Sequence, residues 1–147
     1  RSRDVNLNFG ISEKEAILEY YQFSEPALNT FSKYERDNCI NEKKKFIGKK
    51  NVKTFPLEYV INKYNKGIFP NFLSLDVEGF DIMILNQIDF KDNYPTVVCV
   101  ETISYSTNRE GKKNDEIIQL LTKNGYFLYA DTYINSIFIH EKKWKSK

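Results

Sequence analysis

The sequence predicts an α/β fold built on a mostly parallel sheet, and three observations lead to this prediction. Residues 71–77 and 96–101 are apolar runs without clean alternation, which is typical of strands covered on both faces. Helical patterns separate and follow these runs, as in a parallel sheet with helical crossovers. Both runs end in acidic residues, and ligands of open α/β sheets bind beyond the carboxyl ends of the strands. We therefore expect a ligand site at this edge.

The first part of the chain predicts two strands. Residues 5–11 alternate apolar with polar side chains and end at a glycine, which indicates a short strand followed by a turn. Residues 16–23 are rich in aromatic and β-favouring side chains, and Pro26 stops this second strand.

The segment over residues 32–55 leaves alternatives open. Residues 32–35 have the spacing of a capping box, but no good apolar stripe follows, so a short helix and a loop are equally compatible. Residues 46–47 and 52–55 resemble exposed strand pieces around a bulge or turn at Gly48.

The middle of the chain predicts a helix, a strand and a helix in succession. Pro56 suits the first position of a helix over 56–66, apolar residues recur at helical spacing, and Gly67 suits its C-terminal cap. The strand over 71–77 follows, and after a tight turn an apolar face predicts a helix over 80–88.

The last part predicts a helix and a hairpin. Residues 102–113 form a polar loop that could lie over the strand ends as a lid. Asn114 can cap the next helix, whose stop signals end at Gly125. Two strands, 126–130 and 136–140, then follow with a short connection, so we expect an antiparallel pair.

Composition indicates one soluble domain, residues 1–147. The formal charge is +2 and the lysines are scattered, so nothing indicates nucleic acid as a partner, and the lysine cluster 142–147 is interpreted as a solvated edge. Two cysteines, Cys39 and Cys99, form no disulfide framework, which favours a reduced cytoplasmic setting. No window has the apolar length of a membrane span.

Four motifs occur in order along the chain. They are the D-V-E-G run that ends at Gly79, and the segments 29–31, 98–101 and 134–138. Together these motifs resemble the FkbM-type methyltransferases. The resemblance implies a class I enzyme that moves a methyl group from S-adenosylmethionine to a hydroxyl of a carbohydrate or polyketide-like acceptor, with a sheet in the order 3-2-1-4-5-7-6 and a C-terminal antiparallel hairpin.

The acidic residues at the strand ends are the candidate catalytic residues. Methyl transfer needs donor and acceptor held in line, and an acceptor hydroxyl must lose its proton to a positioned base. Asp76 is the first candidate for this base and Glu101 the second, while Glu78 could serve either or hold the turn. His140, the only histidine, is expected to be a packing or surface residue at the far end of the last strand.

Further site residues are implied by the resemblance alone. Asn8 and Gly10 would lie near the adenine of the cofactor, together with Asp76, and Thr30 and Asn135 would line the acceptor site. No histidine or cysteine joins the carboxylates at ligand spacing, so no metal is expected.

The family's glycine-rich cofactor turn and its ribose-binding acidic residue are not found. The resemblance places residues 5–11 at the third strand of the family, where no neighbour would bridge them to 71–77 and their backbone groups would stay unpaired. We therefore expect the C-terminal portion of a domain that lacks its first two strands and does not bind S-adenosylmethionine normally by itself. The alternatives are another Rossmann-like, nucleotide-dependent enzyme and a catalytically inactive binding or scaffolding module, and upstream sequence would separate them.

Overall fold

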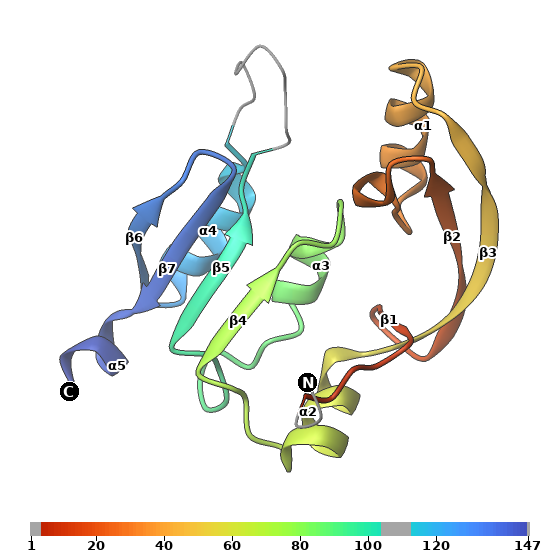
Figure 1. Ribbon diagram of the computed structural model, residues 1–147. Coiled ribbons are helices and arrows are strands. Elements are labelled where there is room, and N and C mark those ends of the chain that lie inside the picture. Colours follow the sequence, from red (N-terminus) through yellow and green to blue (C-terminus); the bar gives the residue numbers. More distant parts are fainter. Residues whose placement is uncertain (1–3, 104–112, 147) are drawn as a thin grey trace. The chain divides into compact units, whose positions relative to one another are not determined.

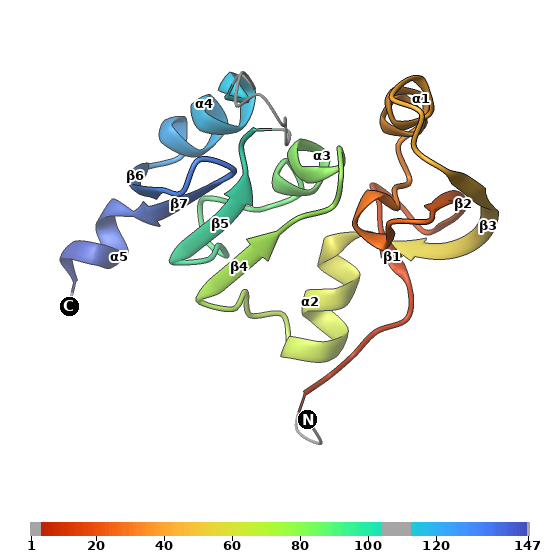
Figure 2. The ribbon, with the colours of Figure 1, turned by 45° about the horizontal axis from the view of Figure 1, so that its top comes forward.

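The computed structural model describes residues 4–103 and 113–146 and has a mixed α/β fold with two sheets (Figure 1, Figure 2). Its contacts divide the chain into two compact units. The first unit is Arg1–Val60 with Glu78–Gln87, and the second is Ile61–Val77 with Ile88–Lys147. One domain can consist of two such units, so the single-domain assignment stays a prediction. Most of the expected lid, 104–112, lies outside the described residues.

The first unit contains a sheet in the order β1-β3-β2. Strand β2 (Ala16–Phe23) confirms the strand predicted over residues 16–23, and it runs antiparallel to β3 (Phe46–Phe55). The expected strand over 5–11 is reduced to β1 (Gly10–Ile11), which pairs with the end of β3 in parallel. The expectation that the backbone groups of this segment would stay unpaired is therefore wrong for Gly10 and Ile11, because β3 supplies a neighbour for these two residues.

The two strand pieces expected around Gly48 form one strand with an irregularity. Gln22 pairs with Gly48, but the next residue, Phe23, pairs with Phe46, so Ile47 is an extra residue on β3. An extra residue on one strand of an antiparallel pair is a bulge. The prediction of a bulge is confirmed, and the ladder continues through it.

Short helices complete the first unit. A 3₁₀ turn, η1 (Pro26–Leu28), precedes α1 (Lys33–Asn41), and the Ser32 hydroxyl accepts a hydrogen bond from the Glu35 backbone N–H (3.2 Å). The helical alternative for this segment is therefore correct. Helix α3 (Asp81–Leu85) is shorter than the predicted helix and buries Ile84 and Leu85.

Helix α2 (Leu57–Asn65) crosses the boundary between the units, close to the predicted bounds. At its start, the Leu57 backbone N–H donates to the side-chain oxygen of Gln87 (2.8 Å), a cap that lies far away in sequence. At its end, Gly67 has a φ of +76°, in the left-handed region that favours glycine. The predicted glycine stop is confirmed.

The second unit contains a sheet in the order β4-β5-β7-β6 (Figure 1). Its strands are β4 (Phe72–Leu75), β5 (Val97–Glu101), β6 (Tyr126–Asp131) and β7 (Asn135–His140). Strands β4 and β5 are parallel, whereas β7 is antiparallel to both β5 and β6. The expected parallel neighbours and the expected C-terminal antiparallel pair are both confirmed.

Burial in this sheet differs from the prediction of strands covered on both faces. Along β5, Val98 and Val100 are fully buried, but Val97 is only half-buried. On β4, Phe72 is 57% exposed. Helix α4 (Asp115–Lys123) covers one face of the sheet (Figure 2), and β4 is an edge strand with a neighbour on one side only. The missing alternation therefore did not mean burial on both faces.

The chain continues beyond β7 into a helix that the sequence did not predict. Helix α5 (Glu141–Lys145) starts directly after His140 (Figure 1). Lys142 and Lys145 are exposed, as expected for a solvated edge, but Lys143 is half-buried. Across the described part of the chain, the helices are too short or too polar to traverse a bilayer.

Candidate functional site

Three residues predicted for the site meet at one edge of the second sheet, here called the carboxylate edge: Asp76, Glu101 and Asn135. Because Leu75 pairs with Val100 in parallel register, the residues that follow them, Asp76 and Glu101, lie side by side. An oxygen of one carboxylate lies within 4.8 Å of an oxygen of the other. Glu101 in turn pairs with Asn135 of β7. Strand pairing thus brings together residues that lie far apart in the sequence.

The carboxylate edge is accessible to a ligand. Asp76 is exposed, and Glu101 and Asn135 are half-buried. Two neighbouring carboxylates can accept protons or hydrogen bonds from hydroxyl groups, and the Asn135 amide can both donate and accept. Carboxylate pairs are also ligands that hard divalent cations prefer, a chemistry that the sequence pattern did not indicate.

Two buried hydroxyl groups, each on the residue after a member of the carboxylate edge, connect the strands there. Thr102 follows Glu101, Ser136 follows Asn135, and the two hydroxyl oxygens are 2.6 Å apart. Both side chains are buried. The pair links the end of β5 to the start of β7 and so fixes the spacing of Glu101 and Asn135.

Lys113 joins the same network, and sequence reasoning missed it. Its Nζ donates to Thr102 Oγ1 (3.1 Å), to an Asp131 carboxylate oxygen (2.8 Å) and to the Tyr133 carbonyl (2.6 Å). The hydrogen bond from Lys113 is the main reason why the pKa of Asp131 lies below its usual range. A single lysine in a polar stretch carries no recognisable pattern, so only the folded structure reveals this role.

The first unit contains the other half of the D-V-E-G motif. Glu78 and Gly79 both have left-handed backbone conformations, with φ of +48° and +95°. The buried Thr30 hydroxyl donates to the Glu78 carbonyl (2.8 Å) and holds this turn. A Cβ on Gly79 would lie 3.1 Å from Glu35 Cγ, a tight contact with a flexible side chain, so the left-handed conformation is the main reason for glycine there. Thr30, predicted to line the acceptor site, thus has a structural partner within its own unit.

The residues expected near the adenine lie in the first unit as well. A Cβ on Gly10 would lie 2.7 Å from Phe31 Cζ, so packing against this ring explains the glycine. Asn8 is exposed and precedes β1. Their position near the adenine of a bound cofactor stays a prediction. Asn29, from the same motif as Thr30, accepts a hydrogen bond from the Phe23 backbone N–H (2.8 Å) and is a turn residue.

His140 lies at the other end of β7 from Asn135, where it packs among aromatic rings. Its ring centroid is 4.5 Å from that of Tyr94 and 4.9 Å from that of Tyr126. Burial, with smaller contributions from Lys143 and Lys142, lowers the pKa of His140 below its ordinary value. The prediction of a packing residue at the far end is confirmed by its 4% exposure.

A family model described as the Methyltransferase FkbM domain matches residues 2–128, which is most of the chain. No curated protein matches significantly, and neither does any solved structure. The match agrees with the resemblance carried by the D-V-E-G run and the three other motifs. The chain belongs to the FkbM methyltransferase family.

Proposed function

We propose that the protein is an S-adenosylmethionine-dependent O-methyltransferase that acts on a hydroxyl of a carbohydrate or polyketide-like acceptor. Membership in the FkbM family supports methyl transfer in general. The observation that carries the choice of a hydroxyl acceptor is the accessible pair Asp76 and Glu101, whose oxygens lie within 4.8 Å of each other. An aliphatic hydroxyl needs such a group, because its proton must leave as the oxygen attacks.

The topology of the second unit supports the same proposal. Its order, β4-β5-β7-β6, coincides with the last four strands of the order that the family resemblance implies. In that order the carboxylate edge lies at the carboxyl ends of β4 and β5, where open α/β sheets bind their ligands.

Each residue of the carboxylate edge has a role in this proposal. Asp76, the most accessible, would accept the proton that the acceptor hydroxyl loses as its oxygen takes the methyl carbon and the carbon–sulfur bond of the donor breaks. Glu101 orients the hydroxyl, and the Asn135 amide holds a neighbouring hydroxyl of the acceptor. S-adenosylmethionine supplies the methyl group when bound. The proposal assigns these three residues to the acceptor side.

The test is methyl transfer from labelled S-adenosylmethionine to a panel of sugar and polyketide-type alcohols, with the protein in its full natural length. Asp76→Asn keeps the size of the side chain and removes its charge, so turnover should fall strongly. Glu101→Gln should cause a smaller loss. Asp92→Asn is the matched control, since Asp92 is an exposed aspartate away from the strand ends.

Two results would contradict the proposal. Equal turnover in wild type and Asp76→Asn would remove this carboxylate from the chemical step. Failure of the wild-type protein to methylate any hydroxyl acceptor would favour one of the alternatives, a nucleotide-dependent enzyme or a binding module, and nucleotide titrations would separate these two.

A further inference from the structure

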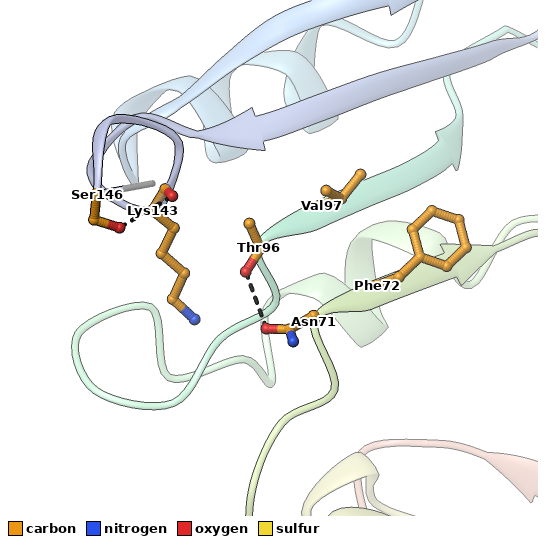
Figure 3. Close-up of a pocket in the computed structure, with 6 residues that line it drawn as sticks. All are labelled: Asn71, Phe72, Thr96, Val97, Lys143 and Ser146. Carbon is orange, nitrogen blue, oxygen red and sulfur yellow. Dashed lines mark hydrogen bonds between the residues drawn. The ribbon is translucent and has the colours of Figure 1, made fainter.

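The second unit has a hollow at the opposite ends of its strands from the carboxylate edge. Its volume is about 330 Å³, within the range of small-molecule sites. The lining residues come from the starts of β4 and β5 and from the C-terminal segment: Asn71, Phe72, Thr96, Val97, Lys143 and Ser146 (Figure 3). No carboxylate is among these lining side chains.

The cation of this hollow, Lys143, is held in place. Its Nζ donates to the Tyr94 carbonyl (2.7 Å) and lies 4.3 Å from the centroid of the Tyr94 ring. Figure 3 shows the side chain reaching from α5 toward Asn71 and Thr96. An ammonium group has three N–H donors, and the Tyr94 carbonyl uses one of them. The remaining donors and the positive charge are available to a ligand without the entropy cost of ordering a free lysine.

The neighbouring polar groups add donors. Thr96 Oγ1 donates to Asn71 Oδ1 (3.1 Å), which orients the amide and leaves its NH₂ group as a donor. Ser146 Oγ donates to the Lys143 carbonyl (3.1 Å), so its proton is already used. The hollow therefore offers a cation and an amide NH₂, a combination that suits an anionic group.

The rest of the lining is apolar. Phe72 is 57% exposed, and its half-buried partner Val97 lies beside it on β5. Covering these side chains with an apolar ligand body removes their surface from water, which is favourable.

We propose that this hollow binds a small molecule that has one anionic group, a phosphate or a carboxylate, on an aromatic or aliphatic body. The anion pairs with Lys143 and the Asn71 amide, and the body packs on Phe72 and Val97. The site is separate from the carboxylate edge, since it lies at the other ends of β4 and β5.

The experiment is calorimetric titration of the purified protein with matched probes. Phenyl phosphate and benzoate carry both features of the ligand, inorganic phosphate carries only the anion, and benzyl alcohol carries only the apolar body. Phenyl phosphate or benzoate should bind saturably with one site, and the better of the two identifies the anion. Inorganic phosphate and benzyl alcohol should both bind more weakly.

Substitutions locate the binding. Lys143→Gln should weaken binding of the better probe by about tenfold or more, the loss expected for a hydrogen bond to a charged group. Lys142→Gln, which removes an exposed lysine of the same helix, should change it by less than about twofold. Phe72→Ser should weaken phenyl phosphate but leave inorganic phosphate unchanged. Lys143→Arg keeps the charge and should retain most of the affinity. This result would show that the loss in Lys143→Gln comes from the missing charge and not from misfolding.

Several outcomes would overturn the proposal. Equal losses in Lys142→Gln and Lys143→Gln would show diffuse attraction by the lysine-rich tail, and absence of saturable binding in wild type would show that the hollow holds no such ligand. Asp76→Asn should leave phenyl phosphate binding unchanged, so this inference and the proposed methyl transfer fail or succeed independently.

Discussion

The two ends of the second sheet hold titratable side chains in opposite surroundings, although β7 runs from one end to the other. At one end, Asn135 joins Asp76 and Glu101, whose carboxylates are accessible and close together. At the other end, His140 is buried against Tyr94 and Tyr126. A charged group can act on a ligand only where it remains hydrated or paired, whereas burial favours the neutral form. The comparison therefore predicts that substitutions of the carboxylates change catalysis, whereas substitutions of His140 and its aromatic neighbours change stability.

The sharpest test compares two single variants, one with a substitution at each end of the sheet. Asp76→Asn should lower turnover on the order of a hundred- to ten-thousand-fold, the usual contribution of a general base, and leave the melting temperature near wild type. His140→Ala should leave turnover near wild type and lower the melting temperature, because it empties a buried position. Initial rates with labelled donor and thermal melts of both variants check this. A large loss of turnover in His140→Ala would contradict the proposal, because it would indicate that the catalytic base lies at the His140 end of the sheet.

Removing the largest buried ring at the second end should cost the most stability. Tyr126 is almost fully buried, packs against His140, and its hydroxyl donates to the Pro95 carbonyl. Tyr126→Ala should reduce the free energy of unfolding by about 3–5 kcal/mol, as expected for a large cavity. Tyr126→Phe, which loses the hydroxyl and leaves the Pro95 carbonyl without it, should cost about 1–3 kcal/mol.

Denaturant titration measures both changes. The control is Tyr129→Ala, since Tyr129 is an exposed tyrosine of the same strand and should change stability by less than about 0.5 kcal/mol. Equal effects at the two tyrosines would show that this end is less well packed than its burial indicates.

Substitutions of Gly125, at the same end of the sheet as His140, can distinguish the cost of backbone strain from the cost of a packing contact. Its φ is +83°, and a Cβ there would lie 3.2 Å from His140 Nε2. Gly125→Ala should destabilise by about 1–3 kcal/mol through both effects. Gly125→Asn, whose side chain tolerates the left-handed region, should cost less if strain dominates and as much if the contact with His140 dominates. Thermal unfolding of the two variants distinguishes these cases, and wild-type stability in Gly125→Ala would contradict both.

The smallest expected effect is the pH dependence that His140 confers. Burial is the largest cause of the lowered pKa of His140 in the folded protein, and the positive charges of Lys143 and Lys142 lower it further. The nearby Glu141 carboxylate acts in the opposite direction. In the unfolded chain the imidazole titrates near its ordinary pKa of about 6.5. Stability should therefore be complete above this pH and decline as the pH falls below it, since the unfolded state binds the proton first. Denaturation midpoints between pH 8 and pH 5 check this, and His140→Gln should flatten that part of the profile.

Local patterns predicted most of the regular elements. Strand β2, the glycine stop of α2 and the Asn114 cap of α4 follow from side chains that act within a few residues of themselves. The bulge near Gly48 has the same local origin. Contacts between distant residues were missed, such as the Gln87 cap of α2 and the Lys113 network, because neither leaves a periodic signal.

The sequence by itself determined that Asp76 and Glu101 stand at the ends of two strands, and its motifs indicated the FkbM family. The tertiary structure confirmed that these two strands are parallel neighbours, and it alone decided that Asn135 joins the carboxylates and that Lys143 faces a hollow at the opposite end. It also decided that β1 pairs with β3 and that β4 is an edge strand. The physical reason is that side-chain periodicity reports which face of a strand is apolar, whereas the choice of neighbouring strand depends on contacts between segments far apart in the chain.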